Sequence, residues 1–410
     1  MSTTAMNNDL STRFQTTLLG LDPRKPDYVV QLVDRLLEQA GAAGSSDVHL
    51  QPGSEGLEVR WRIDGVLRAV TILPAIIAPN IVARLKVMAG LLTYRSDVPQ
   101  EGRIAGATAT SLERRVSTFP TLHGERVVIR LFADTGRFQQ VTELGLPPAV
   151  DTPLRAALQE TTGAVLIVGP AGSGKTTTLY ACLREVMAQS RGERSVVSLE
   201  DPIEAALPGV AQSQVNSATG FDLARGLKSL MRQDPEVIAI GEVRDPESAG
   251  TAFEAALTGQ LVISTFHAGS AAEAIGRLLD MGLEPYVLRS GLRAVLHQRL
   301  LRRLCQCAQP LNDPATWLGL PVKQAHGPTG CLQCLGTGYS GRMLLTEWLE
   351  PKSAGVVRVI LDRADAHSLE LAAIEAGMIT RWSRAVQAVE AGWTSPLEVR
   401  RVLGLGNPLP

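Results

Sequence analysis

The sequence predicts an α/β fold in which a phosphate-loop domain with a parallel sheet follows a smaller α+β domain. At 410 residues the chain is long enough for two or more domains. In its middle part, short apolar runs alternate with segments of helical periodicity, which is typical of buried parallel strands. These runs are residues 164–169, 195–200, 236–242 and 261–267. Upstream, between about residues 46 and 135, the hydrophobic period is close to two, which is typical of an antiparallel sheet.

The first 45 residues predict a polar start followed by a helix, because apolar side chains recur at helical spacing from Val29 to Leu37. In residues 57–63 apolar and polar side chains alternate, and Asp64-Gly65 predicts a turn after this strand. We expect a helix over residues 76–92 and further strands at 114–120 and 125–132. In the last of these, Arg126, Val128 and Arg130 share the face opposite to Val127, Ile129 and Leu131.

The predicted boundaries follow these changes of pattern. Residues 1–45 form a helical segment, 46–135 the first domain, 136–148 a linker and 149–301 the phosphate-loop domain. After the first buried strand, Leu179, Cys182, Leu183 and Val186 have the spacing of a helix face, and Cys182 is expected in the core. A cysteine-bearing segment over 302–342 and a helical region over 343–410 complete the chain.

Bulk composition excludes several classes of protein. The formal net charge of −1 argues against a dedicated nucleic-acid binder, which would show a basic excess. No uncharged apolar run reaches the roughly 18–20 residues that span a bilayer, and the N-terminus does not have the pattern of a secretory signal. Five cysteines in such a chain indicate a cytoplasmic protein with reduced thiols or a metal site.

A complete phosphate-binding motif, GxxxxGK[ST], lies between the first buried strand and the next helix. Backbone N–H groups of such a loop and the helix N-terminus bind phosphates. Lys175 is expected to reach the β- and γ-phosphates and Thr176 to hold Mg²⁺. Because no guanine-reading NKxD motif is present, ATP is favoured. The predicted binding residues are Gly169, Pro170, Ala171, Gly172, Ser173, Gly174, Lys175, Thr176 and Thr177.

Polar residues follow the other three buried strands, at the sheet edge where ligands of α/β proteins bind. Glu242 is the candidate to orient the attacking water or polarise it through Mg²⁺. Glu200 and Glu204 are candidates for a general base or for metal support, and His267 for sensing the γ-phosphate. A helix cap is the alternative interpretation of His267, and Gly241 stands where a metal-binding Asp is usual.

These motifs, in this order, resemble the secretion ATPases of bacterial type II secretion and type IV pilus assembly. The resemblance runs from about residue 46 to 400 through SSDVHLQP, RWRIDGVL, RVSTFPTLHGERVVIRL, GPAGSGKTTTLY, EDPIE, MRQDPEVIAIGEVRDPESA and TGQLVISTFHAGSA. It implies a PAS-like first domain, a RecA-like ATPase domain and a hexameric ring at the inner face of the inner membrane. It also implies an inner-membrane platform protein that converts domain rotation into pilin or pseudopilin extraction, and a membrane-anchored docking protein.

The resemblance assigns roles to particular residues. Arginines that reach nucleotide from the first domain correspond to Arg115 and Arg130, although a solvated sheet face is the simpler reading of the pattern alone. Gln260 replaces the family's usual histidine, and Phe266 and Ala268-Gly269 alter the segment around His267. The additional N-terminal domain of larger members is not found, so docking is expected to differ, to be absent or to involve residues 1–45.

Two closely spaced cysteine pairs lie near the end of the chain, and assembly members of the family commonly bind one structural zinc with two CxxC pairs. Cys331 and Cys334 fit that spacing, whereas Cys305 and Cys307 form a shorter CxC pair. A Cys₄ zinc site is therefore expected, with four reduced thiols as the alternative.

The favoured function is a hexameric motor ATPase that assembles a type II pseudopilus or a type IV pilus, with ATP, Mg²⁺ and a structural Zn²⁺ bound and no nucleic acid. The cysteine segment favours assembly over retraction. Three alternatives stay open: a DNA-uptake pilus motor, a RecA-like ATPase acting on DNA, and a nucleotide-gated scaffold that does not hydrolyse ATP. Lys175, Thr176 and Glu242 argue against the scaffold, and the neutral charge argues against DNA.

Overall fold

The computed structural model describes residues 10, 12, 14–18, 20–105, 114–131 and 138–406. The chain divides into two compact units, each with its own hydrophobic core. The first unit comprises Met1–Asp134, Arg302–Pro310 and His326–Gly341. The second comprises Thr135–Leu301, Leu311–Ala325 and Arg342–Pro410. The cysteine segment therefore packs mainly with the first unit, although its sequence lies within the second half of the chain.

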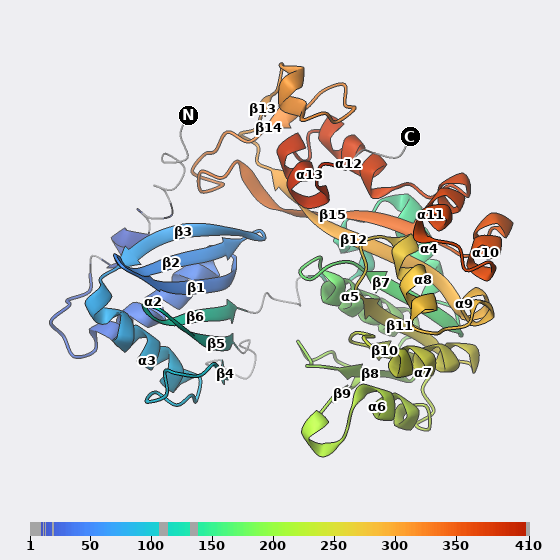
Figure 1. The fold of residues 1–410 in the computed structure, drawn as a ribbon, viewed down its shortest axis with the longest axis horizontal. Helices are drawn as coiled ribbons and strands as arrows, with labels where there is room; N and C mark the ends of the chain where they lie inside the picture. Colours follow the sequence, from blue (N-terminus) through green and yellow to red (C-terminus); the bar gives the residue numbers. More distant parts are fainter. Residues whose placement is uncertain are drawn as a thin grey trace. The chain divides into compact units, whose positions relative to one another are not determined.

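The first unit is built on a six-stranded antiparallel sheet with the order β3-β2-β1-β6-β5-β4 (Figure 1). Its strands are β1 (Ser45–Gly53), β2 (Gly56–Ile63), β3 (Val66–Leu73), β4 (Gln100–Ile104), β5 (Arg114–Thr121) and β6 (Gly124–Leu131). Asp64 and Gly65 both have positive φ, 48° and 79°, so the predicted Asp-Gly turn joins β2 to β3.

Helices α2 (Tyr28–Ala42) and α3 (Ala78–Met88) pack on the apolar face of this sheet. The helical spacing of Leu32, Val33 and Leu36 is explained by their complete burial in this core. The alternating strand pattern is explained in the same way, because Val59, Trp61 and their counterparts on β1 and β6 point into it. The opposite face of the sheet carries charged side chains.

The second unit contains a seven-stranded sheet with the order β15-β12-β7-β11-β10-β8-β9. Its strands are β7 (Gly163–Val168), β8 (Val196–Glu200), β9 (Ala211–Gln214), β10 (Val237–Ile240), β11 (Leu261–Phe266), β12 (Leu292–Leu304) and β15 (Tyr339–Leu349). The pairs formed among β7 to β12 are parallel. The predicted parallel sheet is thus confirmed, and the buried runs are its central strands.

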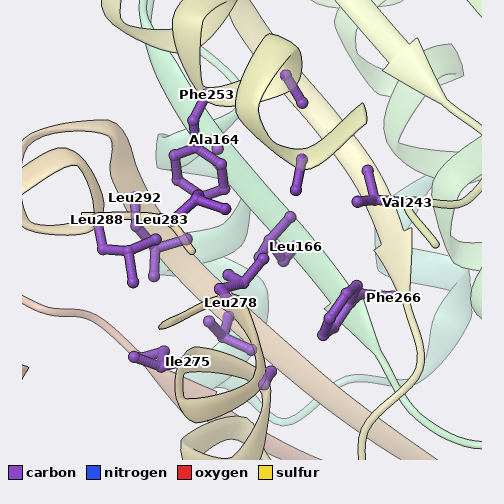
Figure 2. Close-up of a cluster of buried hydrophobic side chains, with 14 of the residues drawn as sticks. Ala164, Leu166, Val243, Phe253, Phe266, Ile275, Leu278, Leu283, Leu288 and Leu292 are labelled. Carbon is purple, nitrogen blue, oxygen red and sulfur yellow. The ribbon is translucent and has the colours of Figure 1, made fainter. Parts of the chain in front are cut away.

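Helices cover both faces of this sheet. Helices α4 (Pro148–Ala157) and α5 (Lys175–Gln189) pack on one face, where Cys182 lies in the core as expected. On the other face lie α6 (Leu223–Leu230), α7 (Pro246–Leu257), α8 (Ala271–Asp280) and α9 (Pro285–Gly291). Figure 2 shows Phe253, Ile275 and Leu278 from these helices in one buried cluster with Leu166 of β7. This double cover explains why the strands are apolar without alternation.

The C-terminal region differs from the expected all-helical segment, since residues 343–349 belong to β15. The run MLLTEWL consists largely of good helix formers, but pairing with β12 overrides this local preference. Helices follow only after this strand: α10 (Ala354–Leu361), α11 (Ala366–Glu375), α12 (Arg381–Glu390) and α13 (Pro396–Leu403). Within the described ranges, the helices are too short or too polar to cross a bilayer.

Candidate nucleotide-binding site

The phosphate loop connects β7 to α5 and depends on two glycines. Gly169 has φ of 156°, and a Cβ there would lie 2.4 Å from the Gln298 carbonyl oxygen and 2.5 Å from Ser173 Oγ. Gly174, with φ of 88°, caps the N-terminus of α5 in the left-handed conformation. The loop therefore directs its backbone toward the start of α5, where the helix dipole favours anions.

Lys175 lies inside this loop and is held by backbone oxygens. Its Nζ donates to the carbonyls of Gly169 at 2.9 Å and Pro170 at 3.1 Å, and lies 3.4 Å from His267 Nδ1. Burial lowers the pKa of Lys175 below its ordinary value, and the negative charge of Glu242 opposes that shift. The lysine is thus fixed at the point where phosphate charge would enter.

Glu242 follows β10 and contacts two cationic or ionisable partners. Its Oε1 lies 2.7 Å from His267 Nε2, and its Oε2 lies 2.7 Å from Arg244 Nη2. The side chain of Glu242 is only 15% exposed, so these contacts fix its orientation. The structure therefore joins Lys175, His267 and Glu242 in one contiguous polar cluster, as the strand-end pattern predicts.

Glu200, the last residue of β8, is buried and accepts three hydrogen bonds. The donors are Tyr180 Oη at 2.5 Å, Ser198 Oγ at 2.6 Å and Gln212 Nε2 at 3.1 Å. Such a carboxylate is well suited to support its surroundings and less suited to accept a proton from water. This environment favours the supporting role among the two roles predicted for Glu200.

A cavity of about 350 Å³ lies in the second unit and is lined by seven of the predicted site residues. Its walls include the phosphate-loop side chains Lys175 and Thr176 as well as the acidic and histidine residues that follow the strands. Carboxylate and hydroxyl oxygens are the ligands that Mg²⁺ prefers, so this wall fits such an ion. The predicted residues that line the cavity are Ala171, Lys175, Thr176, Glu200, Glu204, Glu242 and His267.

The two predicted arginines lie in the first unit, on the charged face of its sheet. Arg115 of β5 and Arg130 of β6 are directly opposite each other in register. Arg130 Nε lies 3.3 Å from Asp47 Oδ1, and Arg62 Nε lies 3.4 Å from the other carboxylate oxygen of Asp47. The Arg130 side chain remains 64% exposed, so Asp47 orients it without covering it.

The four cysteines of the first unit have the geometry of a tetrahedral thiolate site. Their sulfur atoms all lie within 4.8 Å of one another, and three of the separations are 3.8, 3.8 and 3.7 Å. Four sulfurs at the usual Zn–S distance of about 2.3 Å would be about 3.8 Å apart. Backbone N–H groups of Cys331 and Gly338 also donate to Cys334 Sγ. The shorter CxC pair is therefore compatible with zinc.

Two supporting residues were not found from the sequence. Arg244 orients Glu242, and its place two residues beyond that glutamate is a signal that could have identified it. Gln298 of β12 donates from its side-chain amide to the Ser173 carbonyl at 2.7 Å and thereby holds the phosphate loop. Its separation of 125 residues from that loop leaves no local pattern that could reveal the contact.

Comparison with known proteins identifies closely related sequences. The family model described as "Type II/IV secretion system protein" matches residues 23–401. The type II secretion system protein E of Klebsiella pneumoniae is 39% identical over 390 residues, covering 93% of this chain and 77% of that protein. The type IV pilus assembly ATPase TfpB of Acinetobacter baylyi is 36% identical, covering 94% of this chain and 68% of that protein.

Solved structures of more distant proteins share the fold. The Legionella pneumophila ATPase DotB has a TM-score of 0.66 at 21% identity and covers 93% of this chain and 98% of its own. The pilus retraction motor PilT, solved with ADP, has a TM-score of 0.53 at 22% identity and covers 89% of this chain and 98% of its own. At such identities the likeness establishes the fold, which confirms the predicted P-loop ATPase architecture.

Proposed function

The chain belongs to the type II/IV secretion system protein family, and we propose that it is an ATPase that drives assembly of a type II secretion pseudopilus or a type IV pilus. The observation that carries this proposal is the single cavity that brings the phosphate loop together with Glu242 and His267. The cysteine site favours assembly over retraction within the family. The reaction is hydrolysis of ATP to ADP and phosphate.

In this proposal the phosphate chain of ATP binds at the N-terminus of α5, where Lys175 exchanges its backbone partners for phosphate oxygens. The Thr176 hydroxyl holds Mg²⁺, which would neutralise phosphate charge when bound. Glu242, held by Arg244, orients the attacking water. His267 contacts both Glu242 and Lys175, so its position can respond to a γ-phosphate that binds beside those two residues. Glu204 lines the same cavity and is the remaining candidate base.

We further propose that the active form is a hexameric ring on the inner face of the inner membrane, in contact with a platform protein and a docking protein. Arg115 and Arg130 of one protomer would then contact the nucleotide of its neighbour. A guanidinium suits this role, because its planar donors match phosphate oxygens and stabilise developing charge. Asp47 supports the assignment by orienting an arginine that is otherwise solvent-exposed.

A complementation experiment tests the ring and the hydrolysis together. We expect Lys175→Ala and Arg130→Ala to be inactive alone, because one lacks a phosphate ligand and the other lacks the neighbour's arginine. When the two variants are mixed in equal amounts and allowed to reassemble, about a quarter of randomly formed interfaces should combine an intact loop with an intact arginine. Steady-state ATPase rates should therefore recover toward that fraction.

Three results would contradict parts of this scheme. Full activity of Arg130→Ala alone would remove the arginine from the site. Absence of recovery in mixtures that light scattering shows to be co-assembled would place both groups within one protomer. No hydrolysis by the wild-type protein, with or without membranes carrying its secretion system, would remove the ATPase assignment. Arg60→Ala, which changes an arginine of β2 that pairs with Glu58 on the same strand, is the matched control and should keep normal activity.

We also propose that Cys305, Cys307, Cys331 and Cys334 bind one structural Zn²⁺. The expected result is one zinc per chain by elemental analysis, released by a strong chelator or by Cys331→Ser. Loss of the metal should lower the midpoint of thermal unfolding, because the four cysteine sulfurs would lose the ion that holds the cysteine segment together. Cys182→Ser is the control and should retain full zinc content, since Cys182 lies in the other unit. Metal-free protein with unchanged thermal stability would contradict the proposal.

A further inference from the structure

The side chain of Tyr180 lies at the centre of the hydrogen bonds that connect α5 with the segment at the end of β8. We call this segment, residues 200–205, the acidic turn. Tyr180 is completely buried, and its hydroxyl donates to Glu200 Oε2 at 2.5 Å. The same oxygen accepts the backbone N–H of Glu204 at 3.1 Å and of Ala205 at 3.4 Å. One donor and two acceptor sites exhaust the capacity of a phenol oxygen. A single atom thus contacts both ends of the segment from Glu200 to Ala205.

The position of Tyr180 on α5 connects this turn to the phosphate loop. Thr176 and Tyr180 are four residues apart, so their side chains occupy the same face of the helix in successive turns. Thr176 lines the nucleotide cavity, and α5 begins at Lys175. A movement of α5 caused by phosphate binding would therefore move the Tyr180 hydroxyl and, through it, the acidic turn.

The chemistry of the phenol suits a permanent contact. Burial and the adjacent Glu200 carboxylate raise the pKa of Tyr180, so the phenol stays protonated and donates at every physiological pH. Glu200 is secured further by Ser198 and Gln212, and Gln212 also donates to the Ala205 carbonyl. The turn is thus anchored to α5 by Tyr180 and to the sheet by the other two residues.

We infer that Tyr180 is a positioning residue that sets the acidic turn, and with it Glu204, relative to the phosphate loop during hydrolysis. This inference rests on the proposed ATPase function for its activity measurement. It assigns Tyr180 no contact with the nucleotide. Its effect is therefore expected on kcat, because misplacement of acidic groups slows the reaction, whereas the contacts of Lys175 and the loop with ATP are retained.

Two variants that each remove one hydroxyl donor from Glu200 provide the test. Tyr180→Phe keeps the buried ring but loses the contacts to both Glu200 and the Glu204 amide, whereas Ser198→Ala loses only a contact to Glu200. We expect Tyr180→Phe to lower kcat roughly tenfold or more with KM for ATP changed less than about twofold, and Ser198→Ala to have a clearly smaller effect. Tyr286→Phe, which alters an exposed tyrosine of α9, should match the wild type.

Equal losses in Tyr180→Phe and Ser198→Ala would overturn the inference, since the turn contact would then contribute nothing of its own. A rise in KM with unchanged kcat would overturn it as well. Hydrogen exchange of the wild-type protein provides a measurement independent of activity and of the folding of any variant. The Glu204 amide should be protected because its acceptor is a buried phenol, and exchange at the rate of an exposed turn would refute the contact. An inactive wild type with a protected Glu204 amide would overturn the ATPase function alone.

Discussion

Lys175→Ala is expected to reduce kcat/KM for ATP by about 10³-fold or more. Among the described residues, Lys175 is the only buried lysine that lines the cavity beside the phosphate loop. No other described residue of the loop carries a positive charge. The nearby His267 ring is already in contact with Glu242, so it is not expected to replace the lysine. Steady-state phosphate release and the binding of a fluorescent ATP analogue measure the two components. Both turnover and affinity should fall.

The folded state should tolerate this change. The Lys175 ammonium is held in the loop by carbonyl oxygens alone apart from His267, and burial lowers its pKa, so its removal relieves a desolvation penalty. The unfolding midpoint of the nucleotide-free protein should therefore remain unchanged or rise. Lys228→Ala is the matched control, since Lys228 is an exposed lysine of the same unit, and it should hydrolyse ATP normally. ATP binding and turnover unaffected by Lys175→Ala would invalidate the site.

Glu242→Gln is expected to bind ATP while hydrolysing it about 10²- to 10³-fold more slowly. The amide has nearly the same shape as the carboxylate but cannot polarise water, and it loses the charge that faces His267 and Arg244. Removing this negative charge also removes its repulsion of the incoming phosphates in the same cavity, so ATP affinity should be retained or slightly increased. Binding of labelled ATP and single-turnover hydrolysis separate the two effects.

A variant at Glu247 is the control for this prediction. Glu247 is an exposed glutamate on α7 that pairs with Lys228, so Glu247→Gln should be indistinguishable from the wild type. If Glu242→Gln failed to bind ATP, Glu242 would instead be required to build the site or hold its metal. If it hydrolysed ATP at the normal rate, Glu204 would become the leading candidate for orienting water.

The cavity beside the phosphate loop was largely predictable because parallel strands direct their carboxyl ends to one edge of a sheet. That rule brings Glu200, Glu242 and His267 together from separate segments of sequence, and the structure places them around one cavity. The roles within the cavity were less predictable. The sequence does not distinguish Glu200 from Glu204, because the difference lies in the donors that surround each side chain, above all Tyr180. Gln298 depends entirely on how β12 pairs with β7.

The association of the cysteine segment with the first unit was also beyond the sequence pattern. It arises from contacts between residues far apart in the chain. The Gly341 N–H donates to Asp64 Oδ2 at 3.1 Å, and Leu335 packs on the hydrophobic core of the first unit. Nothing in the spacing of the cysteines indicates which surface they cover. Hydrophobic periodicity identifies buried faces within an element but not the partner of a short, irregular segment.

The placement of this segment between β12 and β15 has an evolutionary consequence. These strands are neighbours in the second sheet, and residues 305–338 form the connection between them. A connection between adjacent strands can lengthen or shorten while the strand order stays the same, since the cost of loop closure grows slowly with length. A lineage could thus acquire or delete the cysteine-bearing connection as one unit. The phosphate loop and the strands beside it would be inherited intact, whereas the surface of the first unit and the small core around Trp382, where residues 320–325 pack, would need to adapt.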